Sequence, residues 1–252
     1  MTVELAPALL TGYLLALTRS AAWVFVTPPF GTRQLPTAVK VGFSAALALA
    51  VGPRLADLAV PLEPWPLASA AFLQVAAGLA LGFLSMLLFS AVSVAGGLID
   101  LFSGFSAAQL FDPATSATNS LFGRFYSVLA TTLLFAIDGH LLLVRGFLTS
   151  FDAAPLIHLS AGELGRILTQ DAGLFFLAAV EIAAPLLAAL FLTEAVLGLL
   201  SRAAPQMNVF LLGLPVKILL TLTLAGLAIP LLPDAVSSIV GSTVRQGLNL
   251  VR

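Results

Sequence analysis

Cysteine is absent from this 252-residue chain, and charged side chains are scarce. The lack of cysteine excludes disulfide bonds, thiolate metal ligands and cysteine nucleophiles, although it does not identify a compartment. Only 9% of the residues are Asp, Glu, Lys or Arg, whereas 60% are hydrophobic and the mean hydropathy is +1.08. Because so few polar side chains cannot cover a water-soluble core, the composition indicates an integral membrane protein.

Other missing features narrow the class further. No basic residue precedes Arg19, so the start lacks the basic region of a cleaved signal peptide, and we expect residues from Leu5 onward in the mature protein. A net charge of −1 and a pI near 6.1 give no electrostatic reason to expect nucleic-acid binding. The alternation of apolar and polar residues that is typical of strands is absent as well. We therefore predict an all-α membrane fold with no nucleic acid among its partners.

Prolines, glycines and charges divide the chain into about six apolar segments. Their approximate bounds are 5–27, 37–51, 66 to at least 95, 121–148, 172–200 and 205–232. Asn119 or Ser120 can cap the fourth segment, because each side-chain oxygen can accept hydrogen bonds from the first amides of a helix. Gly213 and Pro215 predict a kink or break in the sixth. Neither an internal repeat nor a linker is visible, so residues 1–252 are predicted to form one domain.

The distribution of charge does not fit a simple six-span bundle. No charged residue lies between Glu63 and Asp100, a stretch far longer than the roughly 20 residues that a helix needs to cross the hydrocarbon. If all six segments cross, the Lys and Arg residues between them fall equally on the two sides of the membrane. Since a bias of basic residues normally sets the orientation, this balance suggests that some helices pack in a protein assembly instead of in lipid.

The second unusual region lies between the third and fourth apolar segments. Three glycines weaken a helix there by about 1 kcal/mol each, and an Asp before a Pro favours a turn. Apolar anchors accompany a string of small polar residues. Such a loop can fill a cavity and leave it at modest cost, as a plug requires; the alternative is an ordinary connector between two membrane helices. The residues concerned are Gly96, Gly97, Asp100, Gly104, Phe105, Leu110, Phe111, Asp112, Pro113, Ser116 and Asn119.

A cluster of polar residues also separates the last two apolar segments. It consists of Ser201, Arg202, Pro205, Gln206, Asn208 and Lys217. An arginine or lysine at bilayer depth costs roughly 2.5 to 3.5 kcal/mol on insertion scales, so the cluster argues for a protein-lined or wet site. Glu194 in the preceding segment can pair with Arg202 or Lys217 across helices. The alternative for Glu194, Glu181, Asp138 and Arg19 is a direct functional role such as proton relay.

No catalytic or metal-binding set can be assembled from the sequence. His140 and His158 are the only histidines and are not spaced as a metal pair, and no serine has a recognisable His or Lys partner. We therefore expect neither an enzyme nor a bound cofactor or metal. Gly78 and Gly82 form a single GxxxG pattern, which permits close approach of two helices.

Two stretches of the sequence resemble the FliR family of the flagellar type III export gate. The first runs from Leu199 to Phe210 and continues with Gly213, Pro215 and Lys217; the second comprises Gly96, Gly97, Asp100, Gly104, Asp112 and Pro113, followed by Gly139, His140, Ser150, Phe151 and Pro155. The similarity covers nearly the whole chain, and the part from Arg202 to Lys217 is specific.

This resemblance implies a noncatalytic pore subunit in the bacterial inner membrane, at the flagellar basal body. FliR relatives assemble with FliP-like and FliQ-like subunits into a helical hetero-oligomeric gate, and they work beside FlhA-like and FlhB-like proteins. Unfolded flagellar subunits and membrane lipid are the other implied partners. In FliR-like proteins the loop between the third and fourth apolar segments plugs the conduit, and here that loop is approximately Gly104 to Ser120.

The implied roles fall into two groups. Plug or gate residues are Gly104, Phe105, Leu110, Phe111, Asp112, Pro113, Ser116 and Asn119; assembly or packing residues are Gly96, Gly97, Asp100, Glu194, Arg202, Pro205, Gln206, Asn208, Phe210, Pro215 and Lys217. Two other functions remain open. A virulence-type injectisome homologue would share fold and role, and a small-solute secondary transporter would account for broken helices and intramembrane charges.

Overall fold

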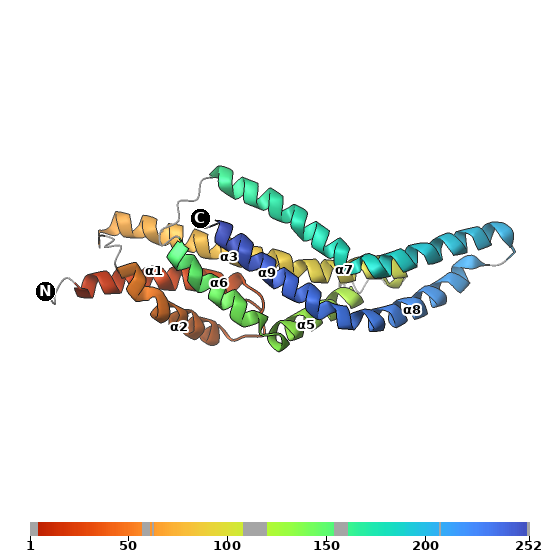
Figure 1. Cartoon of the computed structure of the whole chain (residues 1–252), viewed down its shortest axis with the longest axis horizontal. Coiled ribbons are helices and arrows are strands. Elements are labelled where there is room, and N and C mark those ends of the chain that lie inside the picture. Colours follow the sequence, from red (N-terminus) through yellow and green to blue (C-terminus); the bar gives the residue numbers. More distant parts are fainter. Residues whose placement is uncertain are drawn as a thin grey trace. The chain divides into compact units, whose positions relative to one another are not determined.

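The computed structural model describes residues 5–56, 61, 63–107, 120–153, 161–206 and 208–250, and within these ranges the chain is helical and contains no strand (Figure 1). The α-helices are α1 (Leu5–Val26), α2 (Thr37–Ala56), α3 (Pro64–Ser103), α5 (Leu121–Ala136), α6 (Gly139–Ala153), α7 (Ala161–Ala203), α8 (Val209–Ala228) and α9 (Leu232–Leu250). Short 3-10 turns, η1 (Phe105–Ala107) and η2 (Ile229–Leu231), follow α3 and α8. The predicted all-α class is confirmed.

Five stretches of the described residues are long and apolar enough to cross a membrane. They are Ala8–Val26, Thr37–Leu55, Pro64–Ser103, Gly173–Ala203 and Leu212–Asn249. α5 and α6 meet the same criteria only as a pair, bent at the break between them, which raises the number to six. The number of apolar segments expected from the sequence agrees with this result.

The fourth apolar segment is not the single helix that the sequence predicts over 121–148. The chain leaves the helical conformation at Ile137 and Asp138, and Asp138 has a φ of 56°. Aspartate is one of the few residues besides glycine that enters this left-handed region at modest cost. Because the break depends on one residue inside an otherwise apolar run, hydropathy does not reveal it.

The end of the chain differs from the sequence prediction in two ways. α8 continues through Gly213 and Pro215, so the predicted break there is wrong; proline is tolerated inside apolar membrane helices when the freed backbone groups are satisfied locally. α9 was not predicted, because its serines, asparagine and glutamine hide a one-sided apolar stripe. Val236, Val240 and Gly247 are buried on that stripe.

The chain divides into two compact units, of which the first comprises residues 1–88, 138–172 and 239–252. In this unit α1 packs along α2, and α6 contacts α2. Trp23 of α1 stacks on Phe147 of α6 with 4.4 Å between ring centroids. Glycines bring the helices together: a Cβ placed on Gly146 would lie 3.0 Å from Val244, and one on Gly247 would lie 3.1 Å from Leu81.

The second unit comprises residues 89–137 and 173–238. It contains the end of α3, the whole of α5, and a hairpin in which α7 ends at Ala203 and α8 begins at Val209 and runs back beside it (Figure 1). Leu186 and Leu190 of α7 and Ala225 of α8 are buried, whereas a longer series of apolar side chains on both helices is exposed. The exposed series includes Phe176, Phe191, Leu192, Val196, Leu199, Leu219, Leu222 and Leu227.

Candidate functional site

The predicted plug loop leaves α3 at a defined break. Gly104 has a φ of +87°, a conformation that side chains with a Cβ rarely adopt, and this ends α3 at Ser103. Phe105 then opens the 3-10 turn η1 and meets the ring of Phe122 edge-on at 5.6 Å. The other predicted plug residues lie outside the described part of the chain: Leu110, Phe111, Asp112, Pro113, Ser116 and Asn119.

The carboxylate of Asp100 joins the end of α3 to the start of α5. It accepts hydrogen bonds from the backbone amide of Phe122 at 3.0 Å and from that of Gly123 at 3.5 Å. The Ser120 hydroxyl donates a short hydrogen bond to the same carboxylate and accepts one from the Gly123 amide at 2.8 Å. Asp100 is only 3% exposed. These four residues, which we call the Asp100 cluster, bring together positions 20 or more residues apart in sequence.

Glycines allow the two backbones to approach closely enough for this cluster. A Cβ on Gly96 would overlap the Phe122 carbonyl oxygen and lie 2.6 Å from the Cα of Gly123. A Cβ on the neighbouring Gly97 would have its nearest contact at 3.7 Å, from the Ser120 hydroxyl oxygen. Ser93, one turn earlier on α3, donates a hydrogen bond to the Gly123 carbonyl at 3.3 Å. The strict requirement for glycine in this pair therefore falls on Gly96.

The sequence analysis identified Asp100, Gly96 and Gly97 as packing residues but did not identify their partners. Ser120 was considered only as a helix cap, and the structure assigns it that role through its bond from the Gly123 amide. The roles of Phe122 and Gly123 were missed. Their amides are donors whatever the side chain, so no residue type in the sequence marks them.

The α7–α8 hairpin holds one ion pair between its helices. Lys217 Nζ of α8 pairs with the Glu194 carboxylate of α7, which is one of the two pairings that the sequence suggested. The Lys217 side chain is 17% exposed, but that of Glu194 is 63% exposed. The pair therefore crosslinks the hairpin and still presents a carboxylate on its outer face.

The remaining hairpin residues that the sequence singled out gather at the turn. Arg202 lies in the last turn of α7, where a positive charge suits the helix dipole. Pro205, Gln206 and Asn208 are exposed in the connection, and Pro215 is exposed on α8. Phe210 belongs to α8, but its side chain lies outside the described part of the structure.

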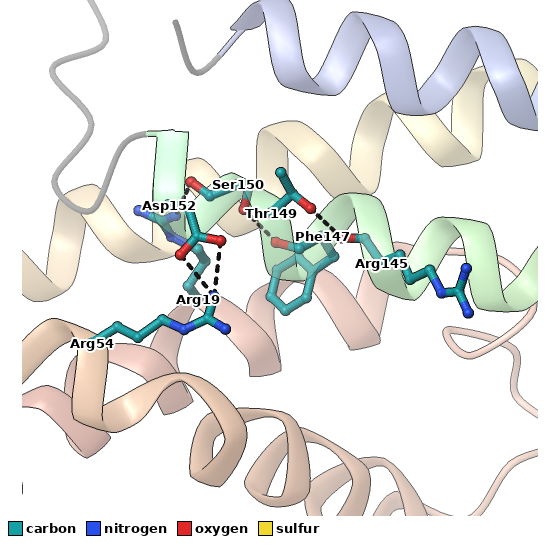
Figure 2. Close-up of polar contacts among 7 residues, drawn as sticks. All are labelled: Arg19, Arg54, Arg145, Phe147, Thr149, Ser150 and Asp152. Carbon is teal, nitrogen blue, oxygen red and sulfur yellow. Dashed lines mark hydrogen bonds and ion pairs between the residues drawn. The ribbon is translucent and has the colours of Figure 1, made fainter.

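Arg19 forms a second polar centre, in the first unit. Its guanidinium is fully buried, and Nε donates to Gln74 Oε1 of α3 at 2.5 Å. An Nη group donates to the Ser150 carbonyl of α6 at 3.2 Å (Figure 2). The guanidinium carbon also lies 4.4 Å from the centre of the Phe151 ring, within the range of a cation–π contact. Arg19 thus links three helices, which supports a packing role over proton relay.

An exposed ion pair lies near this centre. Arg54 of α2 donates to both carboxylate oxygens of Asp152 on α6, at 2.7 and 2.8 Å (Figure 2). Both side chains are about half exposed, so water screens the pair and its contribution to stability is small.

The other ionisable residues that the sequence placed inside apolar segments belong neither to the Asp100 cluster nor to the contacts of Arg19. Asp138 and Glu181 are both exposed. Within the described residues, no group of three or more His, Asp or Glu side chains is arranged to hold a metal ion. His158 lies outside the described residues.

Comparison with known proteins identifies the family. Residues 10–243 match the model of the family described as bacterial export proteins, family 1. The flagellar biosynthetic protein FliR of Bacillus subtilis (strain 168) is 30% identical over 256 residues, covering 99% of this chain and 96% of that protein. FliR of Escherichia coli (strain K12) is 31% identical and covers 87% of this chain and 85% of its own length.

A further match, to a protein that is not named FliR, covers a smaller part of both chains. The surface presentation of antigens protein SpaR of Shigella flexneri is 31% identical over 153 residues, or 60% of this chain and 59% of that protein. These matches show that the chain belongs to bacterial export protein family 1, the family of FliR proteins, and its candidate membrane-spanning helices agree with this. It is a membrane component of bacterial export and not an enzyme, and the resemblance stated from the sequence is confirmed.

Proposed function

We propose that this chain is a pore subunit of a flagellar type III protein export gate, in which the loop from Gly104 to Ser120 closes the conduit for unfolded flagellar subunits. The observation that carries the proposal is the family match over residues 10–243, together with FliR relatives that align along nearly the whole chain. The shorter match to SpaR makes an injectisome subunit the second candidate. Export of polypeptide is favoured over small-solute transport by the same matches.

The burial of the helices supports assembly with sister proteins. In α3, 53% of the candidate span is buried within the chain, whereas in α7 only 22% is buried. Lipid alone could cover apolar side chains of α7, but the exposed carboxylate of Glu194 would then face hydrocarbon at considerable cost. A protein surface that hydrogen-bonds this carboxylate fits better. FliP-like and FliQ-like subunits are the partners that we propose, with FlhA-like and FlhB-like proteins beside them.

The architecture of the loop supports a gate. The Asp100 cluster holds the Ser120 end of the loop against α3, and the loop begins at Gly104, four residues after Asp100. Between these ends the sequence combines the apolar residues Phe105, Leu110 and Phe111 with small polar residues, and Asp112 is its one charged residue. Apolar residues suit a segment that fills a closed conduit, and the small, mostly uncharged residues beside them keep the cost of moving it in and out low.

Deletion of residues 114–119 tests the gate directly. In cells that carry the complete export apparatus, we expect the deletion to raise ion leakage across the inner membrane while the complex still assembles, as judged by copurification with FliP-like and FliQ-like subunits. A membrane as tight as that of wild type, with an intact complex, would count against the loop as a plug. Failure to copurify with either subunit would count against the role in the pore.

A further inference from the structure

We propose that Asp100 is a positioning residue for the gate: its carboxylate fixes the start of α5 against the end of α3, and this fixed base keeps the loop seated in the closed state. The inference rests on the proposed function, because it assigns a device to the loop that closes the conduit. It concerns only described residues, namely the Asp100 cluster and the glycines beside it.

Several donors of different kinds converge on the Asp100 carboxylate. The first amides of a helix have no partner within the helix and need an acceptor from elsewhere. At α5 this acceptor is Asp100, which receives the Phe122 amide, the more distant Gly123 amide and the Ser120 hydroxyl. Hydrogen bonds to an ionised acceptor are about twice as strong as neutral ones, and a negative charge at a helix N-terminus is favoured by the helix dipole.

One face of α3 is shaped for the contact with α5. Ser93, Gly96 and Asp100 follow each other at intervals of three and four residues, so they lie on the same side of the helix. Gly96 brings the backbones together, Ser93 donates to the Gly123 carbonyl, and Asp100 accepts from the amides. A Cβ on Gly97 would make only an ordinary van der Waals contact, 3.7 Å from the Ser120 hydroxyl oxygen. This face therefore brings a hydroxyl donor, a site where the two backbones approach closely and a carboxylate acceptor to the first turn of α5.

The Asp100 cluster also sets the length of chain between α3 and α5. The loop leaves α3 at Gly104, four residues after Asp100, and ends at Ser120, which is itself part of the cluster. If the cluster is lost and the first turn of α5 frays, each residue released adds up to about 3.5 Å of slack to the loop. The closed state thus depends on the base as well as on the residues that fill the conduit.

Two variants test this base without changing the loop itself. Asp100→Asn keeps the side-chain shape but removes the charge and one acceptor oxygen. We expect it to raise ion leakage through the assembled gate by roughly tenfold, the change that the loss of one charge-assisted hydrogen bond can produce. Gly226→Ala, on α8 in the same unit, is the control, since its new Cβ would meet nothing within 4 Å and should leave the leak at the wild-type level.

A reversible covalent link separates positioning from a general loss of folding. The chain has no cysteine, so Gly97→Cys together with Ser120→Cys introduces one possible disulfide. A Cβ on Gly97 would lie 3.7 Å from the Ser120 hydroxyl oxygen, so the two side chains would be in direct contact, and we choose this pair for the crosslink. We would introduce this pair into the Asp100→Asn variant, assemble the complex under oxidising conditions, and measure leakage in inverted membrane vesicles before and after adding reductant.

The expected result is a tight membrane when the pair is oxidised and about a tenfold larger leak after reduction. A leak that persists after oxidation, or a membrane that stays tight after reduction, would overturn the role of Asp100. The deletion of residues 114–119 distinguishes the two levels of the proposal. If that deletion leaks and reduction of the disulfide pair does not, the positioning role fails and the plug remains; if neither leaks, the plug itself is refuted.

Discussion

Gly78 provides the sharpest test of how the first unit is packed. It lies on α3 where this helix meets α1, and a Cβ at this position would overlap the carbonyl oxygen of Arg19. The same Cβ would lie 2.8 Å from the Cβ of Ala22, closer than the 3.0 Å below which a neighbour has to shift. Gly78→Ala is therefore a one-methyl change that the observed contact between α1 and α3 cannot accept.

The magnitude follows from three terms. The contacts are with backbone and Cβ atoms, so α1 has to move away from α3 by about 1 Å, and overpacking of this kind costs about 1–3 kcal/mol. The same movement stretches the bond from Arg19 to Gln74, which lies one turn before Gly78 on α3. Against these losses, alanine gains about 1 kcal/mol of helix propensity over glycine. We expect a net destabilisation of about 2 kcal/mol, or roughly 4–8 °C in Tm for a chain of this size.

The assay is the thermal unfolding midpoint of the complex in detergent, compared with that of a matched glycine variant. Gly42 lies inside α2, and a Cβ there would meet nothing within 4 Å. Gly42→Ala should therefore keep or slightly raise the midpoint. If Gly78→Ala proves as stable as Gly42→Ala, then α1 and α3 do not meet as the structure has them, and the reasoning on close approach is refuted.

Two further predictions concern the polar residues inside apolar segments. Arg19→Met keeps an unbranched stem but removes the bond to Gln74, so we expect a loss of about 2–4 kcal/mol in the free energy of unfolding, partly recovered by adding Gln74→Leu; strictly additive losses would contradict direct coupling. Asp138→Val should cost about 1–3 kcal/mol because of the positive φ, whereas Asp138→Gly should preserve both stability and export. Loss of export by a stable Asp138→Gly protein would show instead that the carboxylate is required.

Much of the helical framework could be predicted from the sequence, since its boundaries depend on local chemistry. α1 ends at Val26, just before Thr27 and the prolines at positions 28 and 29, and α2 begins at Thr37, just after Pro36. Ser120 caps α5 as its side chain predicts. Each of these signals acts within a few residues of the boundary that it sets, so a single sequence contains all the information needed.

Two kinds of feature could not be predicted in the same way: those in which opposing local preferences compete, and those that depend on contacts between residues far apart in the sequence. The break at Asp138 needs one residue to enter the left-handed region. Pro215 lies inside α8 without ending it, although proline usually ends a helix, and membrane helices tolerate proline more often than soluble ones. α9 is polar by composition, and its buried stripe has meaning only once other helices are packed against it. The partners of Asp100 are backbone amides that follow it by more than 20 residues, so they carry no signature in the sequence.

Arg19 and Glu194 are both charged residues within apolar segments, yet the chain accommodates them in opposite ways. Arg19 is completely enclosed by its own chain, with hydrogen bonds to α3 and α6. Glu194 has one partner, Lys217, and leaves most of its side chain on the outer surface of the hairpin. Since a carboxylate facing hydrocarbon is costly, that surface needs protein or water beside it. We therefore expect the first unit to complete its polar contacts alone, whereas the hairpin completes them only within an assembly.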